Sequence, residues 1–313
     1  MSAPGPLRVA EACALIVTYR PDLEALDRLV RSIEGQVGRL LVFDNASSGA
    51  DVAAYLDRLE AAGVAVFRSA GNVGLGAAMN QGARFARQAG CSTLLILDQD
   101  SVPAPDMVRI LADALAALER EGPVAAVGPQ FEDARSGRLA PFVQVGFPFN
   151  RKHYGGPGQR VACDFLISSG TLVRLATFDR VGGLDESLFI DNVDLEWCQR
   201  ARSLGLGLHG ICDARMHHSI GDSLRASRLA PEGWTVHQPV RLYYIMRNRT
   251  LLYRRAATPA VWVAQDVPRL VLKFFLTLWM CEPRGSYLRH MLRGIGDGIR
   301  GRSGPMPVRG QPQ

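Results

Sequence analysis

The N-terminal half of the chain alternates between short apolar runs and longer stretches in which apolar residues recur at helical spacing. The apolar runs are bounded by turn-forming residues and predict buried strands at residues 13–19, 39–44, 64–68 and 94–97. The stretches between them predict helices at residues 22–34, 50–62, 76–89 and 106–121. Such alternation is typical of an α/β fold with a mostly parallel sheet, whose ligands bind at the carboxyl ends of the strands.

The pattern is weaker in the second half. Residues 124–128 predict a fifth strand, and residues 135–158 are rich in glycine and proline, as a functional loop or flap is. Residues 161–173 return to a strand-like pattern, and residues 185–203 become helical in their second half. Residues 241–255 predict an aromatic, arginine-rich helix.

Residues 261–281 are strongly apolar but include Asp266, Pro268, Arg269 and Lys273. Charged side chains are unfavourable at a bilayer centre, so we do not expect this segment to span a membrane. It could be a helix, or two helices broken at Pro268, that lies on a membrane surface with its basic neighbours near anionic headgroups. A buried C-terminal helix is an equally good interpretation.

Composition supports a globular protein. With 313 residues, 47% hydrophobic and 21% charged, the chain can bury a substantial core in one large domain or two small ones. Its six cysteines form no CxxC pair, which favours reduced, buried thiols and argues against a zinc cluster. The N-terminal sequence has no secretory pattern, and we expect a cytoplasmic protein.

The net charge of +6 is unevenly distributed. Residues 241–313 contain thirteen Lys and Arg against three Asp and Glu, whereas the rest of the chain contains 23 against 27. The basic character therefore belongs to the C-terminal quarter, where peripheral contact with a membrane is one expectation.

Two carboxylates, Asp98 and Asp100, directly follow the apolar run 94–97 and are separated by Gln99. In an extended segment residues i and i+2 point to the same side, so both acids can face one divalent cation and its phosphates. Two acids in a surface turn would be the commoner explanation elsewhere. The buried strand before them favours a metal site here.

Asp44 ends the second predicted strand in the same way. It could accept a hydrogen bond from a base imide or a ribose hydroxyl, or form an Asx turn with Asn45 that caps the next helix. The parallel with Asp98 favours the ligand role.

The glycines between Gly71 and Gly82 join a strand to a helix and let backbone N–H groups approach an anion. Met79 stands where GxGxxG would have its third glycine, which disfavours a dinucleotide fingerprint.

Three acids, Asp191, Asp194 and Glu196, gather around a predicted helix start. Glu196 and Arg200 form an i,i+4 pair, so part of this cluster is expected to be structural. An acid placed before the helix could serve as general base toward a hydroxyl. Farther on, His217 and His218 are adjacent and would point opposite ways in a strand, so at most one of them is expected to join a site.

Taken together, these segments resemble the inverting family 2 glycosyltransferases of the GT-A fold, a Rossmann-like, mostly parallel sheet flanked by helices, and among them bacterial rhamnosyltransferases. The resemblance spans about residues 12–255 and depends on the order of its motifs. Those motifs are Thr18-Tyr-Arg-Pro, Val42-Phe-Asp-Asn-Ala-Ser, Gly71-Asn-Val-Gly, Leu97-Asp-Gln-Asp-Ser, Phe165-Leu-Ile-Ser-Ser-Gly, Gly183-Leu-Asp-Glu, Phe189-Ile-Asp-Asn-Val-Asp-Leu-Glu-Trp-Cys, His218-Ser-Ile-Gly-Asp and Tyr243-Tyr-Ile-Met-Arg-Asn.

The resemblance implies a role for each matching residue. Asp194 would be the catalytic base, although Val193 replaces the acid that commonly precedes it, and Asp191 stays an alternative. Asp100 and His218 would hold Mg²⁺ or Mn²⁺. The donor would contact Thr18, Tyr19, Asp44, Asn72, Gly74, Asp98, Gln99 and Asp100. The acceptor would contact Gly170, Glu196, Trp197, Arg247 and Asn248.

The resemblance also implies an organisation and partners. Residues 1–10 would be a flexible N-terminus, 11–255 a GT-A domain (11–130 nucleotide-sugar-binding, 131–255 acceptor and catalytic), 256–299 a basic, apolar helical extension that could contact a membrane, and 300–313 a disordered tail. The expected donor is dTDP-L-rhamnose, and the expected acceptor is a free saccharide or one linked to a polyprenyl diphosphate in bacterial surface polysaccharide or O-antigen synthesis. A homo-oligomer is possible.

Three alternatives stay open. Another donor, such as a UDP-hexose or UDP-galactofuranose, would use the same residues. A nucleotidyltransferase would need a basic, glycine-rich clamp after the first strand, where this chain has Thr18-Tyr-Arg-Pro. A nucleic-acid-binding module would explain the basic C-terminus, but the acids at the sheet edge oppose a polyanion. We therefore expect no nucleic-acid partner.

Overall fold

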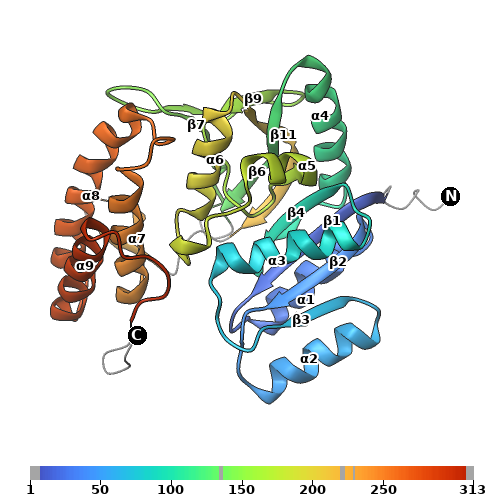
Figure 1. The fold of residues 1–313 in the computed structure, drawn as a ribbon, viewed down its shortest axis with the longest axis horizontal. Coiled ribbons are helices and arrows are strands. Elements are labelled where there is room, and N and C mark those ends of the chain that lie inside the picture. The colour runs from blue at the N-terminus through green and yellow to red at the C-terminus, as the bar shows by residue number, and fades with distance from the viewer. Residues whose placement is uncertain (1–7, 134–136, 219–222, 228–229, 308–313) are drawn as a thin grey trace.

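The computed structural model describes residues 8–133, 137–218, 223–227 and 230–307. One nine-stranded sheet forms the centre, in the order β3-β2-β1-β4-β10-β6-β11-β5, with β9 also paired to β11 (Figure 1). Its strands are β1 (Val9–Thr18), β2 (Val37–Asp44), β3 (Ala65–Arg68), β4 (Thr93–Asp98), β5 (Val102–Pro103), β6 (Val124–Asp133), β9 (Arg160–Cys163), β10 (Leu172–Arg174) and β11 (Gly207–His218). Two small antiparallel pairs accompany it, β7 (Phe142–Gln144) with β8 (Arg151–His153) and β12 (Ser223–Ser227) with β13 (Ala230–Val236).

Helices cover both faces of the sheet because the strand residues alternate between them. In β1, Ala14 and Ile16 face one core cluster, and Cys13 and Leu15 face the other. The first cluster is covered by α1 (Leu23–Ile33), α2 (Ala50–Ala61) and α4 (Met107–Glu121). The second is covered by α3 (Leu75–Gln88), α5 (Leu175–Val181) and α6 (Val193–Ser203), which the short 3-10 helix η1 (Glu186–Leu188) precedes. The mostly parallel α/β architecture is thereby confirmed.

The predicted strands and helices of the N-terminal half are confirmed within a few residues. The strand-like pattern at residues 161–173 corresponds to two separate strands, β9 and β10, joined by a loop. Gly170 in that loop has a φ of +84°, a conformation that an extended strand does not contain. The loop brings Ser168 and Ser169 to the carboxyl end of β4, where function was expected.

Three further helices form a separate layer beside the domain: α7 (Pro239–Leu252), α8 (Ala260–Met280) and α9 (Arg284–Ile299). In Figure 1, α7 lies between α6 and the pair α8 and α9. Leu242 and Met246 of α7 pack against Leu270 of α8 and Met291 of α9 in a third core cluster. Within the described part of the chain, no helix is both long and apolar enough to cross a bilayer.

The C-terminal segment that was expected to form one helix, or two helices broken at Pro268, is a single helix, α8, which continues through Pro268. Helix α9 lies within the helical extension expected at residues 256–299. Its glycines weaken the helical pattern, yet Gly294 and Gly298 are needed there: a Cβ would collide with the Tyr243 carbonyl oxygen at the first and lie 2.8 Å from that of Arg247 at the second.

The chain ends are also more ordered than expected. Strand β1 begins at Val9, inside the expected flexible N-terminus. Residues 300–307, expected to be disordered, contact α7 and α9: Tyr244 accepts a hydrogen bond from the Met306 N–H, and Arg293 donates one to the Pro307 carbonyl. Residues 1–7 and 308–313 lie outside the described residues.

Candidate active site

Asp98, Asp100 and His218 meet at the carboxyl edge of the sheet. Strand β4 ends at Asp98 and strand β11 ends at His218, and β10 and β6 lie between these strands. The short strand β5 brings Asp100 close to His218 despite the two strands between β4 and β11. It follows Asp100 and pairs antiparallel with the end of β11, with His217 opposite Val102. Each of the three side chains offers one ligand atom, and these atoms lie within 4.8 Å of one another.

The cluster fits a divalent cation. Asp98 Oδ2 lies 3.8 Å from His218 Nε2, and Asp100 Oδ1 lies 3.4 Å from His218 Nδ1. Two carboxylates with one imidazole are a donor set that accepts Mn²⁺ and tolerates Mg²⁺. The family resemblance assigned Asp98 to donor binding alone, but its carboxylate is placed as well as that of Asp100 to be a metal ligand.

The same side chains perturb one another's protonation. Burial raises the pKa of Asp98, an effect that His218 opposes and Asp100 reinforces. Burial by itself would lower the pKa of His218, but the hydrogen bond with Asp100 and the charge of Asp98 outweigh it and raise the pKa. The imidazole that holds its proton more tightly is also the one that would bind a cation, so proton and metal compete for this position.

Two serines that were not predicted individually support the cluster. Ser101 Oγ lies 3.2 Å from His218 Nδ1 and 2.5 Å from Ser169 Oγ, which accepts a hydrogen bond from the Asp98 N–H. Ser169 occurs in the Phe165-Leu-Ile-Ser-Ser-Gly motif, which was the one signal for it. Gly170 follows, and its N–H bonds the Ile96 carbonyl at 2.8 Å. A Cβ on Gly170 would lie 2.5 Å from Pro129, so this glycine is required for backbone packing.

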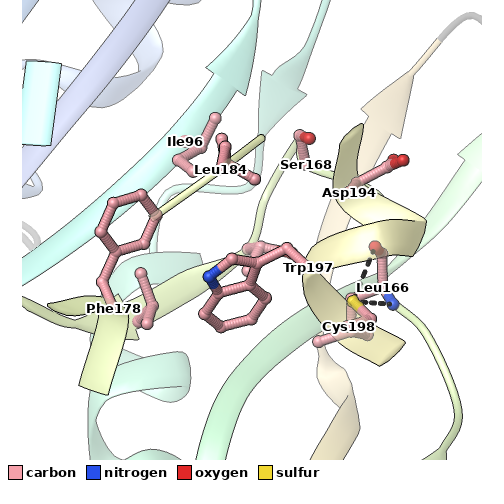
Figure 2. A pocket seen from close by; sticks show the side chains of 10 residues that line it. Ile96, Leu166, Ser168, Phe178, Leu184, Asp194, Trp197 and Cys198 are labelled. Atoms are coloured by element: carbon pink, nitrogen blue, oxygen red, sulfur yellow. Dashed lines mark hydrogen bonds between the residues drawn. The ribbon is translucent and has the colours of Figure 1, made fainter. Parts of the chain in front are cut away.

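Asp194 lies in the first turn of α6, beside Ser168 (Figure 2). Burial raises the pKa of Asp194 to about 6; the hydrogen bond from the Leu195 N–H opposes the rise, and the nearby charge of Asp98 adds to it. A carboxylate with a pKa near the working pH suits a general base. The same effect indicates that Asp194 lies near Asp98.

Asp191 is occupied by a structural contact. Its carboxylate pairs with the Arg241 guanidinium at 3.2 Å, and its backbone has a φ of +63°. The Asn248 amide holds its carbonyl oxygen at 2.8 Å. Of the two acids considered as base, Asp194 has the better placement. Arg241 was not predicted, since no local pattern links it to an acid fifty residues earlier.

On the donor side, Asp44 and Thr18 lie at the ends of neighbouring strands. Thr18 Oγ1 donates to Asp44 Oδ1 at 3.0 Å, and the Ser47 N–H donates to Asp44 Oδ2 at 3.0 Å. Asp44 therefore stabilises the turn after β2, which was the alternative to a role in ligand binding. It does so at the sheet edge where the nucleotide base was expected. Gln99 Oε1 accepts from the exposed Tyr19 N–H at 2.9 Å, which joins the first and fourth strand ends.

The Gly71–Gly74 loop links the donor half to the segment before α6. Asn72 is exposed, and its Oδ1 accepts from the Gly74 N–H at 2.9 Å and from Asn45 Nδ2 at 3.1 Å. Gly74 has a φ of +85° and is buried against Phe189, whose carbonyl oxygen accepts the Leu75 N–H at 2.5 Å. Gly74 thus positions Phe189. Of Asn72 and Gly74, the two residues expected to contact the donor here, Asn72 is the more accessible to a nucleotide.

All five residues expected to contact the acceptor are buried. Glu196 pairs with Arg200 at 2.7 Å and Arg255 at 2.9 Å. Trp197 stacks on Phe178 and lines a cavity of about 20 Å³, which has room for about one water molecule. In Figure 2 the Trp197 ring points away from the Asp194 carboxylate. These contacts are structural.

Arg247 and Asn248 are fully buried. The Asn248 amide donates to the carbonyls of Leu188, Ile190 and Asp191 at 2.7–3.0 Å, and Arg247 Nη2 donates to the Leu188 carbonyl at 2.8 Å. Both residues therefore hold the backbone that leads to Asp194, which corrects their assignment to the acceptor. Residues 219–222, which follow His218 in its motif, lie outside the described residues.

Comparison with known proteins identifies the family. Residues 13–170 match the profile of glycosyl transferase family 2. The chain is 30% identical over 295 residues to the dTDP-rhamnosyl transferase RfbF of Shigella flexneri, covering 93% of this chain and 96% of that protein.

Solved structures agree on the fold. A structure of GalNAc-T7 with UDP, GalNAc and Mn²⁺ superposes with a TM-score of 0.57 at 13% identity, covering 85% of this chain and 56% of that one. One of S. aureus TarS in complex with UDP-GlcNAc has a TM-score of 0.51 at 15% identity, covering 93% and 81%. At these identities the likeness establishes the GT-A fold alone.

Proposed function

The chain belongs to glycosyltransferase family 2, and from this membership we propose that it is an inverting rhamnosyltransferase that uses dTDP-L-rhamnose as donor. The observation that supports the proposal most is the relative in Shigella flexneri, a dTDP-rhamnosyl transferase aligned along nearly the whole chain. The Asp98-Gln99-Asp100 sequence, which resembles rhamnosyl-transferring members, supports the same donor.

Asp98, Asp100 and His218 are the residues that would hold Mg²⁺ or Mn²⁺. A divalent cation there would offset the negative charge that builds on the departing nucleotide diphosphate. The protein contributes two fixed carboxylates, an imidazole held by Ser101, and the strand pairing that keeps these groups together.

Asp194 would take the proton from the acceptor hydroxyl as that oxygen attacks the anomeric carbon. Its pKa of about 6 leaves it ionised at neutral pH, ready to accept a proton. Asp191, the other acid considered as base, is engaged by Arg241. One available carboxylate on the acceptor side fits a single displacement, in which the anomeric configuration inverts.

For the acceptor we infer a saccharide, carried by a polyprenyl diphosphate, in bacterial surface polysaccharide synthesis on the cytoplasmic side of the membrane. The family resemblance and the basic, apolar C-terminal helices support this inference.

A donor panel tests the proposal. The purified chain is given dTDP-L-rhamnose or a UDP- or GDP-sugar, with and without Mn²⁺, and nucleotide diphosphate release is measured, with Asp194→Asn as the control for enzyme-dependent turnover. We expect dTDP-L-rhamnose to give the highest rate, and only with metal. Preferential turnover of a UDP-hexose would reject rhamnose while keeping the glycosyltransferase, and the absence of binding to every nucleotide sugar would reject the site.

A further inference from the structure

Large apolar side chains are exposed in a stripe along α8. Val267, Val271, Phe275 and Trp279 recur every four residues, and Leu272 lies beside them. Phe275 is 63% exposed and Trp279 is 59% exposed. A contiguous apolar surface of this kind marks an interaction site, because it is costly to leave in water.

Helix α9 adds a second exposed stripe. Leu288, Leu292 and Ile299 are exposed on it, whereas Tyr287 and Met291 are buried in the third core cluster. The exposed apolar side chains of the two helices together define what we call the α8–α9 face. Because the buried sides of both helices already pack within that cluster, this face is left without an intramolecular partner among the described residues.

The charges around this face are almost all positive. Among the described residues 260–300, Glu282 is the one exposed acid, since Asp266 and Asp297 are buried in ion pairs. The exposed basic residues are Arg269, Arg284, Arg289 and Arg300. A second copy of the same face would bring like charges together, whereas anionic lipid headgroups would complement them.

We propose that the α8–α9 face binds the surface of an anionic lipid bilayer, with α8 lying in the headgroup region. An amphipathic helix with an apolar stripe and flanking arginines is the type of element that inserts partway into this region. Trp279 suits the boundary, since its ring is apolar and its N–H is polar. Arg269 and Lys273 oppose deeper insertion.

Docking there would also orient the catalytic site. Helix α7 packs against α8 and α9 on one side, and its Arg247 and Asn248 hold the backbone that leads to Asp194 on the other. The α8–α9 face and the candidate active site therefore both pack against one helix, α7. This inference goes beyond the proposed transfer reaction and does not depend on the identity of the donor.

Vesicle sedimentation tests the inference with the full chain. Phosphatidylcholine vesicles with or without phosphatidylglycerol are mixed with the protein, and the bound fraction is measured. We expect binding to the anionic vesicles, loss of binding when the ionic strength rises from about 0.1 M to about 1 M, and a blue shift of tryptophan emission on binding.

Variants separate the apolar contribution to vesicle binding from the electrostatic one. The pair Leu272→Ser and Phe275→Ser should lower the vesicle partition constant about tenfold or more, whereas Leu204→Ser, a similarly exposed leucine at the end of α6, should leave it unchanged. The pair Arg269→Glu and Arg289→Glu should abolish the preference for anionic lipid, with Arg84→Glu as the control on α3.

Two results would overturn the proposal. One is no binding to anionic vesicles at low salt by a folded chain. The other is a dimer, seen by sedimentation velocity, that the Leu272→Ser and Phe275→Ser pair dissociates without any effect on vesicle binding, which would assign the face to a second copy. Neither result concerns nucleotide diphosphate release with a soluble acceptor, so failure here is distinguishable from failure of the proposed function.

Discussion

The imidazole Nδ1 of His218 lies 3.4 Å from the Asp100 carboxylate, although His218 ends β11 and Asp100 follows β4, two strands that are not neighbours in the sheet. The pairing of β5 with the end of β11 creates this contact. It brings the ends of β4 and β11 together at one candidate metal site, and the consequences for activity can be measured.

Replacing Asp100 should remove activity without unfolding the protein. Asp100→Asn removes one anionic ligand from a partly exposed site, so we expect the rate of transfer to fall about a thousandfold while the melting temperature changes little. Nucleotide diphosphate release at saturating metal and a thermal melt provide the measurements. Asp106→Asn, an exposed acid just before α4, is the matched control, and an Asp100→Asn variant with normal turnover would contradict the metal assignment.

Metal affinity should increase with pH. Because Asp100 and Asp98 raise the pKa of His218, a proton occupies the imidazole above the pH at which an ordinary histidine loses it, and that proton must leave before a metal binds. Titration of Mn²⁺ by calorimetry across the neutral range should show tighter binding at each step upward. His218→Asn should bind Mn²⁺ more weakly and with less pH dependence. If the affinity of this variant changed with pH as steeply as that of the wild type, another group would control binding.

Replacing Asp194 should abolish transfer and yet stabilise the fold. The raised pKa means that the folded protein holds this proton more tightly than the unfolded chain does, so stability is lost as pH rises from 3.8 to about 6. The loss is at most about 3 kcal/mol in the free energy of unfolding, less what residual solvent contact removes.

Asp194→Asn cannot ionise, so its melting temperature should exceed that of the wild type at neutral pH, and the difference should vanish below about pH 4. Melts across this range, with the exposed Asp113→Asn as reference, give the measurement. A wild-type rate of transfer that does not increase as pH rises through about 6 would contradict its role as base.

Asn248 should behave as a positioning residue. Asn248→Ala removes the side-chain donor of the Ile190 and Asp191 carbonyls and one of the donors to the Leu188 carbonyl, which Arg247 still contacts. We therefore expect a loss of about 2–3 kcal/mol in stability and a drop of about tenfold or more in kcat. The donor and acceptor KM values should change little. Thr250→Val is the control, since its hydroxyl bonds the Met246 carbonyl of its own helix. A large rise in acceptor KM at unchanged kcat would restore the acceptor-binding assignment.

Two glycines of one loop should respond differently to alanine. Gly74 has a φ of +85°, and a Cβ there would lie 2.7 Å from the Phe189 carbonyl oxygen, whereas a Cβ on Gly71 would meet nothing within 4 Å. Gly74→Ala should therefore lower stability by about 2 kcal/mol or more and weaken donor turnover, whereas Gly71→Ala should be nearly silent. Denaturant melts and donor kinetics compare the two, and equal effects would contradict the contact between Gly74 and Phe189.

Local pattern was sufficient for much of this protein. The period of the apolar residues predicted the parallel core, because a buried strand and an amphipathic helix each need a fixed spacing of apolar positions. The position of Asp98 and Asp100 after a buried strand predicted where the candidate metal ligands lie, because strand ends meet at one edge. The acid at the start of α6 was likewise visible.

Tertiary structure decided what each polar residue does. Arg247 and Asn248 were expected at the acceptor, but charged and amide groups buried in a helix need distant partners, and here the carbonyls of residues 188–191 supply them. The choice of Asp194 over Asp191 depended on Arg241, about fifty residues away in sequence. Sequence alone established which residues carry reactive groups, whereas only the packing of distant segments decided which of those groups remain free to react, because a buried polar group is first committed to the partner that compensates its loss of water.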